Sequence, residues 1–251
     1  MLKNSTHWIS LSIFLFMAIL LANCNKDEEN EGITLKSVEQ YQVTIPELSG
    51  LAPYNSLDEF VTISDNKSNV YIISNTGETL KTLDFTGEDL EGVAYDSITS
   101  SFFLLEEKRK EVIHLDSNGI ELNRFPININ NTDERHGPEG ITFNPDNEHI
   151  YIVNEKLPSL LLEMTLTGEV VRETTLSFAD DYSAIYYDHM DSTLWILSDE
   201  SRTLTKCDLF GNPYNTWNTG IDKGEGLIVD SKNLMIYIVD DNNSRLYQFI
   251  F

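Results

Sequence analysis

The chain has 251 residues, with 41 acidic and 17 basic side chains and a formal net charge of −24. So negative a field disfavours nucleic acid and anionic lipid headgroups, and it favours cations or basic partners. Length alone predicts one or two domains, but an internal repeat overrides that estimate because repeated units share one closure.

Residues 1–24 predict a lipoprotein signal peptide. Lys3 precedes an apolar run from Trp8 to Ala22, which closes with Leu-Ala-Asn-Cys at Cys24. The run is short for a bilayer span, which favours a cleaved signal over a permanent helix. Cys24 resembles the cysteine of a bacterial lipobox, which becomes the lipidated N-terminus. We expect an outer-membrane lipoprotein of the cell envelope, periplasmic or surface-facing; the alternatives are a plain secreted protein and an uncleaved anchor.

Polar residues without periodicity follow, and residues 25–37 predict a disordered acidic tether. The Lys-Asp-Glu-Glu run at 26–29 resembles a signal that sends some lipoproteins to the outer face of the outer membrane, and a plain solvated linker is the alternative. The other cysteine, Cys207, lies among alternating apolar residues and is expected to be a small buried hydrophobe. We therefore expect no disulfide within the mature chain.

A motif of an acid or Ser, then Gly or Ala, then an apolar residue occurs five times. Its first positions are Ser49, Glu91, Glu139, Ser183 and Glu225. Sixteen residues after each stands an acid: Asp65, Glu107, Glu155, Asp199 and Asp241. The copies are 42, 48, 44 and 42 residues apart, whereas the spacing inside each copy is constant. This pattern indicates a closed repeat fold with one shared site.

Each unit contains short runs rich in Ile, Val, Phe, Tyr and Thr, bounded by Asn, Asp, Gly and Ser, which is typical of strands and turns. The complete middle units predict strands at Glu91–Asp96, Ser101–Glu107, Val112–Asp116, Glu121–Asn128, Glu139–Asn144, His149–Glu155, Leu160–Leu166, Glu169–Leu176, Ser183–Asp188, Thr193–Asp199, Thr203–Leu209 and Tyr214–Thr219. A period of about 45 residues with four strands per unit predicts the blades of a β-propeller.

The last unit has three predicted strands, Gly226–Asp230, Met235–Asp240 and Arg245–Phe251, and lacks the outermost one. The segment Val38–Ile45 precedes the first motif, where other units carry their fourth strand. We predict an all-β, five-bladed β-propeller over residues 38–251, in which the N-terminal strand completes the last blade and pairs its open edge.

In such a blade the first strand lines the central channel and the second returns antiparallel, so the two motif positions meet on one face near the axis. The Gly keeps the crowded backbone there free of a side chain. Glu91, Glu139 and Glu225 are expected to converge in the channel, where crowded carboxylates need either raised pKa values or a cation. Oxygen ligands without His or Cys predict Ca²⁺ rather than Zn²⁺, and Mg²⁺ is disfavoured by its strict octahedron.

The outer acids are candidates to support the metal ligands or to contact a bound molecule. The structural role, in which they bond backbone N–H groups of the next blade and hold the ring together, is favoured for them. This set comprises Asp65, Glu107, Glu155, Asp199 and Asp241. His136 joins them as a candidate, because it lies in an insertion, Ile127–Pro138, that runs directly into Glu139 and should overhang the channel.

The motifs resemble those of the SdiA-regulated family, bacterial envelope proteins distantly similar to NHL-repeat propellers. The resemblance covers residues 38–251 and rests on the stretches Leu-Ser-Gly-Leu-Ala, Leu-Glu-Gly-Val-Ala-Tyr, Pro-Glu-Gly-Ile-Thr-Phe and Gly-Glu-Gly-Leu, with Phe-Leu-Leu-Glu-Glu-Lys-Arg, Tyr-Ile-Val-Asn-Glu-Lys and Leu-Ser-Asp-Glu-Ser-Arg. It implies a five-bladed propeller with a calcium site, carried here by Glu91, Glu139 and Glu225. Ser49 and Ser183 depart from the motif.

Three functions fit this sequence. The leading prediction is a non-enzymatic, calcium-binding propeller, tethered to the membrane by its lipid, that binds an unknown small molecule or protein on the channel face. The second is a metal-dependent hydrolase of a phosphate ester or lactone, with His136 as the candidate for proton transfer. The third is a scaffold for a protein complex. The sequence contains no motif for a Ser or Cys nucleophile and no phosphate-binding Gly loop.

Overall fold

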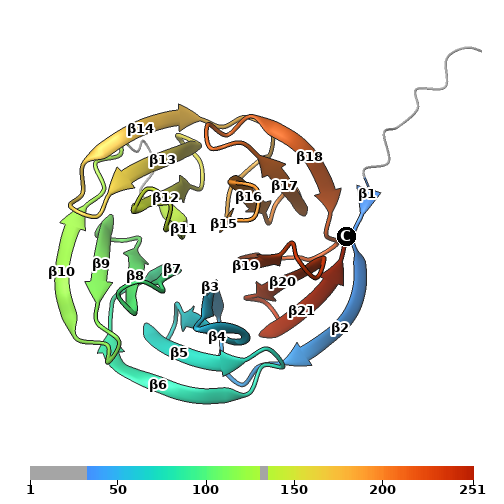
Figure 1. Ribbon diagram of the computed structural model, residues 1–251, viewed down its shortest axis with the longest axis horizontal. Helices are drawn as coiled ribbons and strands as arrows, with labels where there is room; N and C mark the ends of the chain where they lie inside the picture. Colours follow the sequence, from blue (N-terminus) through green and yellow to red (C-terminus); the bar gives the residue numbers. More distant parts are fainter. Residues whose placement is uncertain (1–32, 131–134) are drawn as a thin grey trace, which may run out of the picture. The chain divides into compact units, whose positions relative to one another are not determined.

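The computed structural model describes residues 33–130 and 135–251, whose regular elements are all β-strands (Figure 1). Within these two ranges there is no helix long and apolar enough to cross a membrane. The predicted signal peptide, Cys24 and the first part of the predicted tether lie outside the described residues.

Five sheets surround a central axis, which confirms the predicted five-bladed all-β propeller. The innermost strands are β3 (Leu48–Tyr54), β7 (Leu90–Asp96), β11 (Pro138–Asn144), β15 (Ala184–Asp188) and β19 (Gly224–Asp230). The second strands are β4 (Ser56–Ser64), β8 (Ser101–Glu106), β12 (His149–Asn154), β16 (Thr193–Ser198) and β20 (Met235–Asp240). These bounds agree with the predicted strands to within two residues wherever a strand was predicted.

The third strands of the five sheets are β5 (Asn69–Ser74), β9 (Glu111–Leu115), β13 (Leu160–Thr165), β17 (Thr203–Cys207) and β21 (Arg245–Ile250). The outermost strands are β6 (Thr79–Thr86), β10 (Glu121–Pro126), β14 (Val170–Thr175), β18 (Pro213–Asn218) and β2 (Lys36–Gln42). A two-residue strand, β1 (Ile33–Thr34), adds to the outer edge of β18 in parallel.

Burial falls from the second strands to the periphery. Every residue of β8 and β16 is buried, whereas β2 exposes nearly its whole length. The second strands pack between two neighbouring sheets, so a continuous apolar run such as Phe102–Leu105 is buried on both faces. Five apolar cores result, one at each interface between adjacent blades. Cys207 is buried at one of these interfaces as a free cysteine, as predicted.

The first and last parts of the described chain share one sheet. β2 pairs antiparallel with β21, from Lys36 opposite Ile250 to Gln42 opposite Arg245 (Figure 1, blue beside red). The predicted strand began at Val38; the observed one begins two residues earlier and ends at Gln42, and Val43 and Ile45 then turn inward and are buried. Strand structure also extends into residues 33–37 of the predicted tether, because Leu35 is buried beside the last two blades.

The innermost strands touch where the motif glycines lie. A Cβ atom added to Gly92 would lie 2.5 Å from the carbonyl oxygen of Glu139 in the next blade, and one added to Gly140 would lie 2.8 Å from Cα of Ala184. Gly226 meets Gly50 in the same way, at 2.7 Å from its carbonyl carbon. Real side chains do not fit at these distances, so the glycines set how closely the blades approach around the axis.

Removal of residues 1–45 is expected to destabilise the propeller strongly. The truncation leaves the edge of β21 unpaired and removes buried Leu35, Val43 and Ile45, each of which contributes about 1.5–3 kcal/mol of burial energy. At about 2–4 °C per kcal/mol for a protein of this size, the melting temperature should fall by roughly 10 °C or more.

The matched control is a protein that starts at Leu35, which loses β1 but retains β2 and the three buried side chains. Thermal unfolding followed by circular dichroism measures both. A protein starting at Pro46 that melts together with the control would show that β2 adds nothing to ring stability.

Candidate metal site at the acidic mouth of the channel

A β-bulge displaces each motif glutamate from its sheet. The register between β7 and β8 passes from Leu90 directly to Gly92, so Glu91 has no partner across the ladder. Glu139 and Glu225 are skipped in the same manner in β11 and β19. Bulges re-aim side chains, and here they direct three glutamates away from the strand ladder into the channel mouth. The repeat spacing located these residues but did not predict the bulges.

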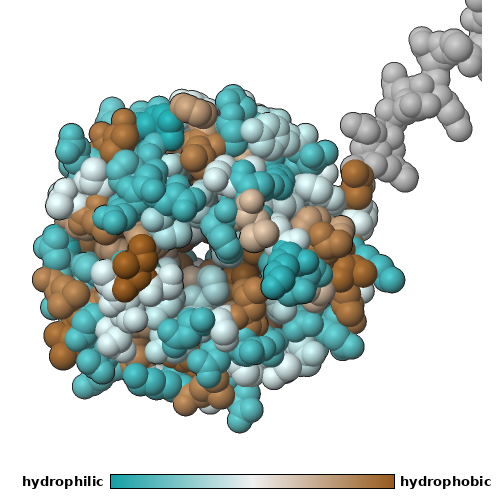
Figure 2. All heavy atoms as spheres, in the orientation of Figure 1, coloured by the Kyte–Doolittle hydropathy of each residue, from teal (hydrophilic) through white to brown (hydrophobic). Residues whose placement is uncertain are grey.

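The predicted residues line one cavity of about 360 Å³ at this mouth. It contains Glu91, Glu139, Glu225, Ser49, Ser183, Asp65, Glu155, Asp199, Asp241 and His136. Glu107 does not line the cavity itself, although its charge acts on Glu91. The space-filling view shows a narrow opening on the axis of the face that it presents (Figure 2). The structure therefore brings together almost the whole predicted set.

A third repeated position was missed by the sequence reasoning. It lies two residues before each motif and is occupied by Glu47, Asp89, Gly137, Asp181 and Lys223. In four units its carbonyl oxygen accepts a hydrogen bond from the peptide N–H of the outer acid. The donor is Asp65 to Glu47 (3.1 Å), Glu107 to Asp89 (3.0 Å), Glu155 to Gly137 (2.9 Å) and Asp241 to Lys223 (3.0 Å). This bond closes the inner hairpin in those four units and accounts for the fixed spacing inside the motif. The same period in the sequence could have revealed it.

The two serines of the motif connect adjacent blades. Ser183 Oγ donates to the carbonyl oxygen of Gly224 at 2.6 Å. Ser49 Oγ lies 2.6 Å from the carbonyl oxygen of Glu91 and 2.9 Å from its Oε2, and donates to one of them. The positions that depart from glutamate thus join the first blade to the second and the fourth to the fifth.

Burial raises the pKa values of the channel glutamates. The pKa values of Glu91 and Glu139 lie well above the usual range, because both are buried and neighbouring carboxylates repel their charge. The pKa of Glu225 is raised to about 8, first by burial and then by Asp199. Burial and the charge of Asp89 raise that of Glu107 to about 7. Without a cation, several of these groups hold protons at neutral pH.

Lys223 neutralises one side of the cavity. Its Nζ lies 2.6 Å from Asp199 Oδ2. Burial raises the pKa of Asp199, but contacts with Asp181 and Lys223 outweigh burial and lower this pKa below its usual value. Asp181 accepts hydrogen bonds from Ser198 Oγ and from the peptide N–H of Glu200. Burial and its contact with Asp199 raise the pKa of Asp181 to about 7. An added cation is therefore favoured elsewhere in the cavity.

On the side of the first two blades, Asp65, Asp89 and Glu91 each offer a carboxylate oxygen, and these oxygens lie within 4.8 Å of one another. Within the described ranges this is the group of acids close enough to share one ion; Glu139 and Glu225 are not part of it. Glu107 adds a buried Oε1 without a hydrogen-bond partner among the described residues. An all-oxygen donor set with an unsatisfied buried carboxylate fits a hard cation such as Ca²⁺.

His136 forms a second feature of the mouth. Its Nδ1 lies 2.6 Å from Glu155 Oε2. Lys156 lies on the other side of Glu155, with its Nζ 3.4 Å from Glu155 Oε1 and 2.5 Å from Glu200 Oε1. An imidazole–carboxylate pair therefore lines the cavity.

A family model described as SdiA-regulated matches residues 29–250. The chain belongs to the SdiA-regulated family. That family assignment agrees with the resemblance of the Glu-Gly motifs and with the propeller fold.

Solved structures with similar folds extend the comparison. The gluconolactonase of Xanthomonas campestris is 13% identical, with a TM-score of 0.57 over 86% of this chain and 94% of its own. The virginiamycin B lyase of Staphylococcus aureus is 15% identical, with a TM-score of 0.51 over 85% and 70%. A chain of a nidogen/laminin complex is 14% identical, with a TM-score of 0.54 over 77% and 72%. At such identities the likeness supports the fold alone.

The metal-free SdiA-regulated protein is expected to lose stability as the pH rises from about 4.5 to 8. The folded-state pKa values of Glu225 (about 8) and Glu107 (about 7) exceed the ordinary value of 4.5. Between these limits the folded state binds more protons than the unfolded state, so each group lowers the free energy of unfolding by up to about 1.4 kcal/mol per pH unit. Urea unfolding in chelator at pH 5 and pH 8 measures the change.

Glu225→Gln removes one of these titrations and keeps the shape of the side chain. It should flatten the pH dependence between pH 5 and 8 and stabilise the metal-free protein at the upper limit. If the parent is equally stable or more stable at pH 8, the buried glutamates do not carry the repulsion described here.

Proposed function

We propose that this SdiA-regulated propeller is an envelope-tethered, calcium-binding module whose acidic mouth holds Ca²⁺ and presents it to a ligand or protein partner. The observation that carries the proposal is the group of Asp65, Asp89 and Glu91, together with the unsatisfied Oε1 of Glu107, whose carboxyl group is electrostatically coupled to Asp89 and Asp65. These residues crowd negative charge into a partly dehydrated site, which a divalent cation would neutralise.

Calcium suits this site better than other common metals. Ca²⁺ accepts six to eight oxygen ligands in flexible geometry, whereas Mg²⁺ requires a strict octahedron and Zn²⁺ prefers His or Cys. Glu139 and Glu225 line the same cavity and add to its negative potential. Binding requires the carboxylates to ionise, so affinity for Ca²⁺ should increase with pH, because the pKa values of Glu91 and Asp65 are raised by burial and by neighbouring acids.

The partner is expected to be neutral or basic, since the chain carries a formal net charge of −24 and repels nucleic acid. The mouth is concave and polar, which suits a small hydroxylated molecule or a short protein segment whose oxygens complete the shell of the cation. Attachment to the membrane through a lipid on Cys24 would hold this mouth at the cell envelope.

A second candidate function is hydrolysis of a phosphate ester or lactone. The pair formed by His136 and Glu155 favours it, because a carboxylate that contacts imidazole Nδ1 orients the ring, and an oriented imidazole at the cavity is suited to proton transfer. A cation at this mouth would supply electrophilic polarisation. A panel of phosphate esters and lactones, assayed with Ca²⁺ or chelator, distinguishes the two functions: turnover lost in His136→Ala would establish the hydrolase.

Calcium is expected to raise the melting temperature of the parent protein, and chelator to lower it. A ligand at a hundredfold excess over its Kd stabilises the folded state by about 2.7 kcal/mol, or roughly 5–10 °C for a domain of this size. Glu91→Gln should reduce this response by at least half, because it removes a ligand charge with little change of shape. Differential scanning calorimetry in Ca²⁺, Mg²⁺ and chelator measures the shifts.

Glu173→Gln, on the exposed strand β14, is the matched control, since it removes the same charge far from the channel. It should respond to calcium as the parent does. If calcium leaves the parent unchanged and titration calorimetry detects no binding, the acidic mouth is structural and the proposal fails.

Cys24→Ala is expected to release the protein from membranes or to leave the signal uncleaved. The reason is the predicted lipid attachment, which anchors stably only where several acyl chains are present. Fractionation of cells and intact mass of the purified protein measure location and processing. Membrane retention with normal cleavage in the variant would contradict lipid anchoring through this cysteine.

A further inference from the structure

The opposite end of the channel contains a second cavity of different chemistry. The five innermost strands begin at the acidic mouth, and the residues lining the second cavity come from their far ends and the turns that follow. This cavity has a volume of about 390 Å³, within the range of small-molecule sites. Its lining is mainly apolar and includes Leu51, Pro53, Tyr95, Phe143, Tyr186 and Met190. We define it as the apolar mouth.

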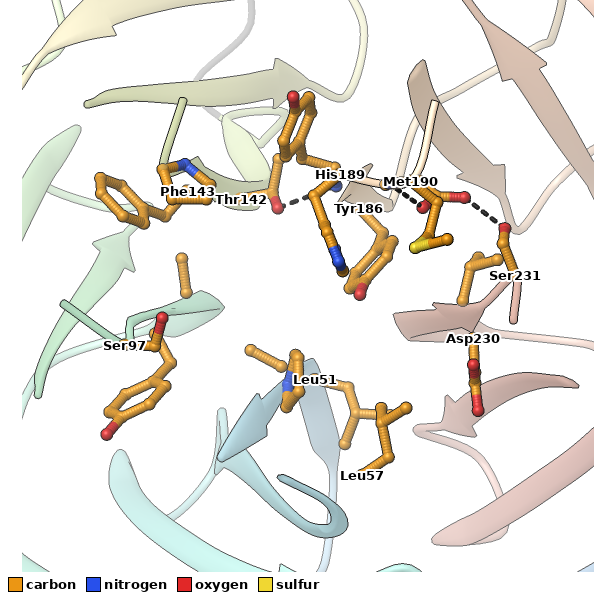
Figure 3. Close-up of a pocket in the computed structure, with 18 of the residues that line it drawn as sticks. Leu51, Leu57, Ser97, Thr142, Phe143, Tyr186, His189, Met190, Asp230 and Ser231 are labelled. Atoms are coloured by element: carbon orange, nitrogen blue, oxygen red, sulfur yellow. Dashed lines mark hydrogen bonds between the residues drawn. The ribbon is translucent and has the colours of Figure 1, made fainter. Parts of the chain in front are cut away.

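Tyr186 is the distinctive group of the apolar mouth. It lies three residues after the motif position, where two other blades carry Ala52 and Ala94. Ala52 and Ala94 line the same cavity as Tyr186. The ring of Tyr186 extends into this cavity (Figure 3). Its hydroxyl makes no hydrogen bond to any of the described residues. Burial raises the pKa of this hydroxyl, so the group stays protonated. It is therefore a donor available to a bound molecule.

The two carboxylates near this tyrosine are already engaged by the chain. Asp188 accepts hydrogen bonds from the peptide N–H of Met190 and from Ser231 Oγ (Figure 3). Asp230 accepts from the peptide N–H and the side-chain amide of Asn233, at 3.1 and 2.6 Å. These oxygens support the turns of the fourth and fifth blades, and the two carboxyl groups also act electrostatically on Tyr186. Their charge disfavours an anionic occupant.

The rim adds aromatic surface. Tyr95 packs edge-on against Tyr54 at 5.1 Å between ring centroids and tilts against Phe102 at 5.2 Å. A rigid aromatic wall of this kind loses little conformational entropy when a flat molecule packs against it.

We propose that the apolar mouth binds a small, neutral, ring-containing molecule whose oxygen acceptor pairs with the hydroxyl of Tyr186. The occupant is a small molecule rather than a macromolecule, because the cavity is concave and confined to the end of the channel. The propeller then has two separate sites, a cation site and an apolar site, at opposite ends of one channel.

Prodan, 6-propionyl-2-(dimethylamino)naphthalene, is a suitable probe, since it is neutral, aromatic and fluorescent, and carries a carbonyl acceptor. Titration of the full folded protein should give saturable binding to one site with a blue-shifted emission. Tyr186→Phe keeps the ring and removes the donor, so it should weaken binding about three- to tenfold. Tyr214→Phe, on the exposed strand β18, is the matched control and should leave binding unchanged.

Two comparison ligands complete the test. 2-(Dimethylamino)naphthalene lacks the carbonyl and should bind the parent and Tyr186→Phe with equal, weaker affinity, and naphthalene-2-sulfonate should bind poorly because it is charged. Chelator should not affect any of these affinities. The proposal is overturned if prodan does not bind, if Tyr186→Phe binds it as the parent does, or if binding is lost with chelator or in Glu91→Gln.

Discussion

Close approach of five backbones around one axis is the constraint on which this structure depends. Gly92, Gly140 and Gly226 each face the backbone of the following blade at distances where a side chain would collide. Ala184 is the one motif position with a side chain, and it is the smallest that exists. Apolar cores between blades supply the stability, but the glycines allow the innermost strands to meet, and without that contact the wedge-shaped cores would not close into a ring.

The same contact explains why acids gather at one end. A residue beside the glycine cannot point between the blades, because the neighbouring backbone occupies that space, and the bulge at Glu91, Glu139 and Glu225 leaves the channel as the available direction. Burial and repulsion by neighbouring acids then raise the pKa values of all three. The stabilising packing of the ring and the destabilising concentration of charge are thus consequences of one geometry, which is how functional sites commonly arise on stable folds.

The sequence predicts the blades well because strand and turn chemistry repeats with a constant period. It also locates Glu91, Glu139 and Glu225, since residues that recur with the period of the blades occupy equivalent positions in each blade, at the same level along the propeller axis. Asp89 and Asp181 escaped prediction because acids before a strand are common in turns, and their role depends on side-chain direction. The apolar mouth escaped for another reason: Tyr186 differs from the residues at equivalent positions, and a search for repetition passes over what is unique.

Joining the first and last strands in one sheet has a kinetic consequence. The side chain of Gln42 donates to the carbonyl oxygen of Asn243, 201 positions away along the chain. Contacts of such sequence separation close large loops and slow the folding of β proteins. Four blades can assemble from local hairpins as the chain emerges, but the fifth waits for β21. Until then β2 has no partner, and an emerging chain carries an open strand edge that favours association with other chains. The window for misassembly therefore lasts until the final blade has been synthesised.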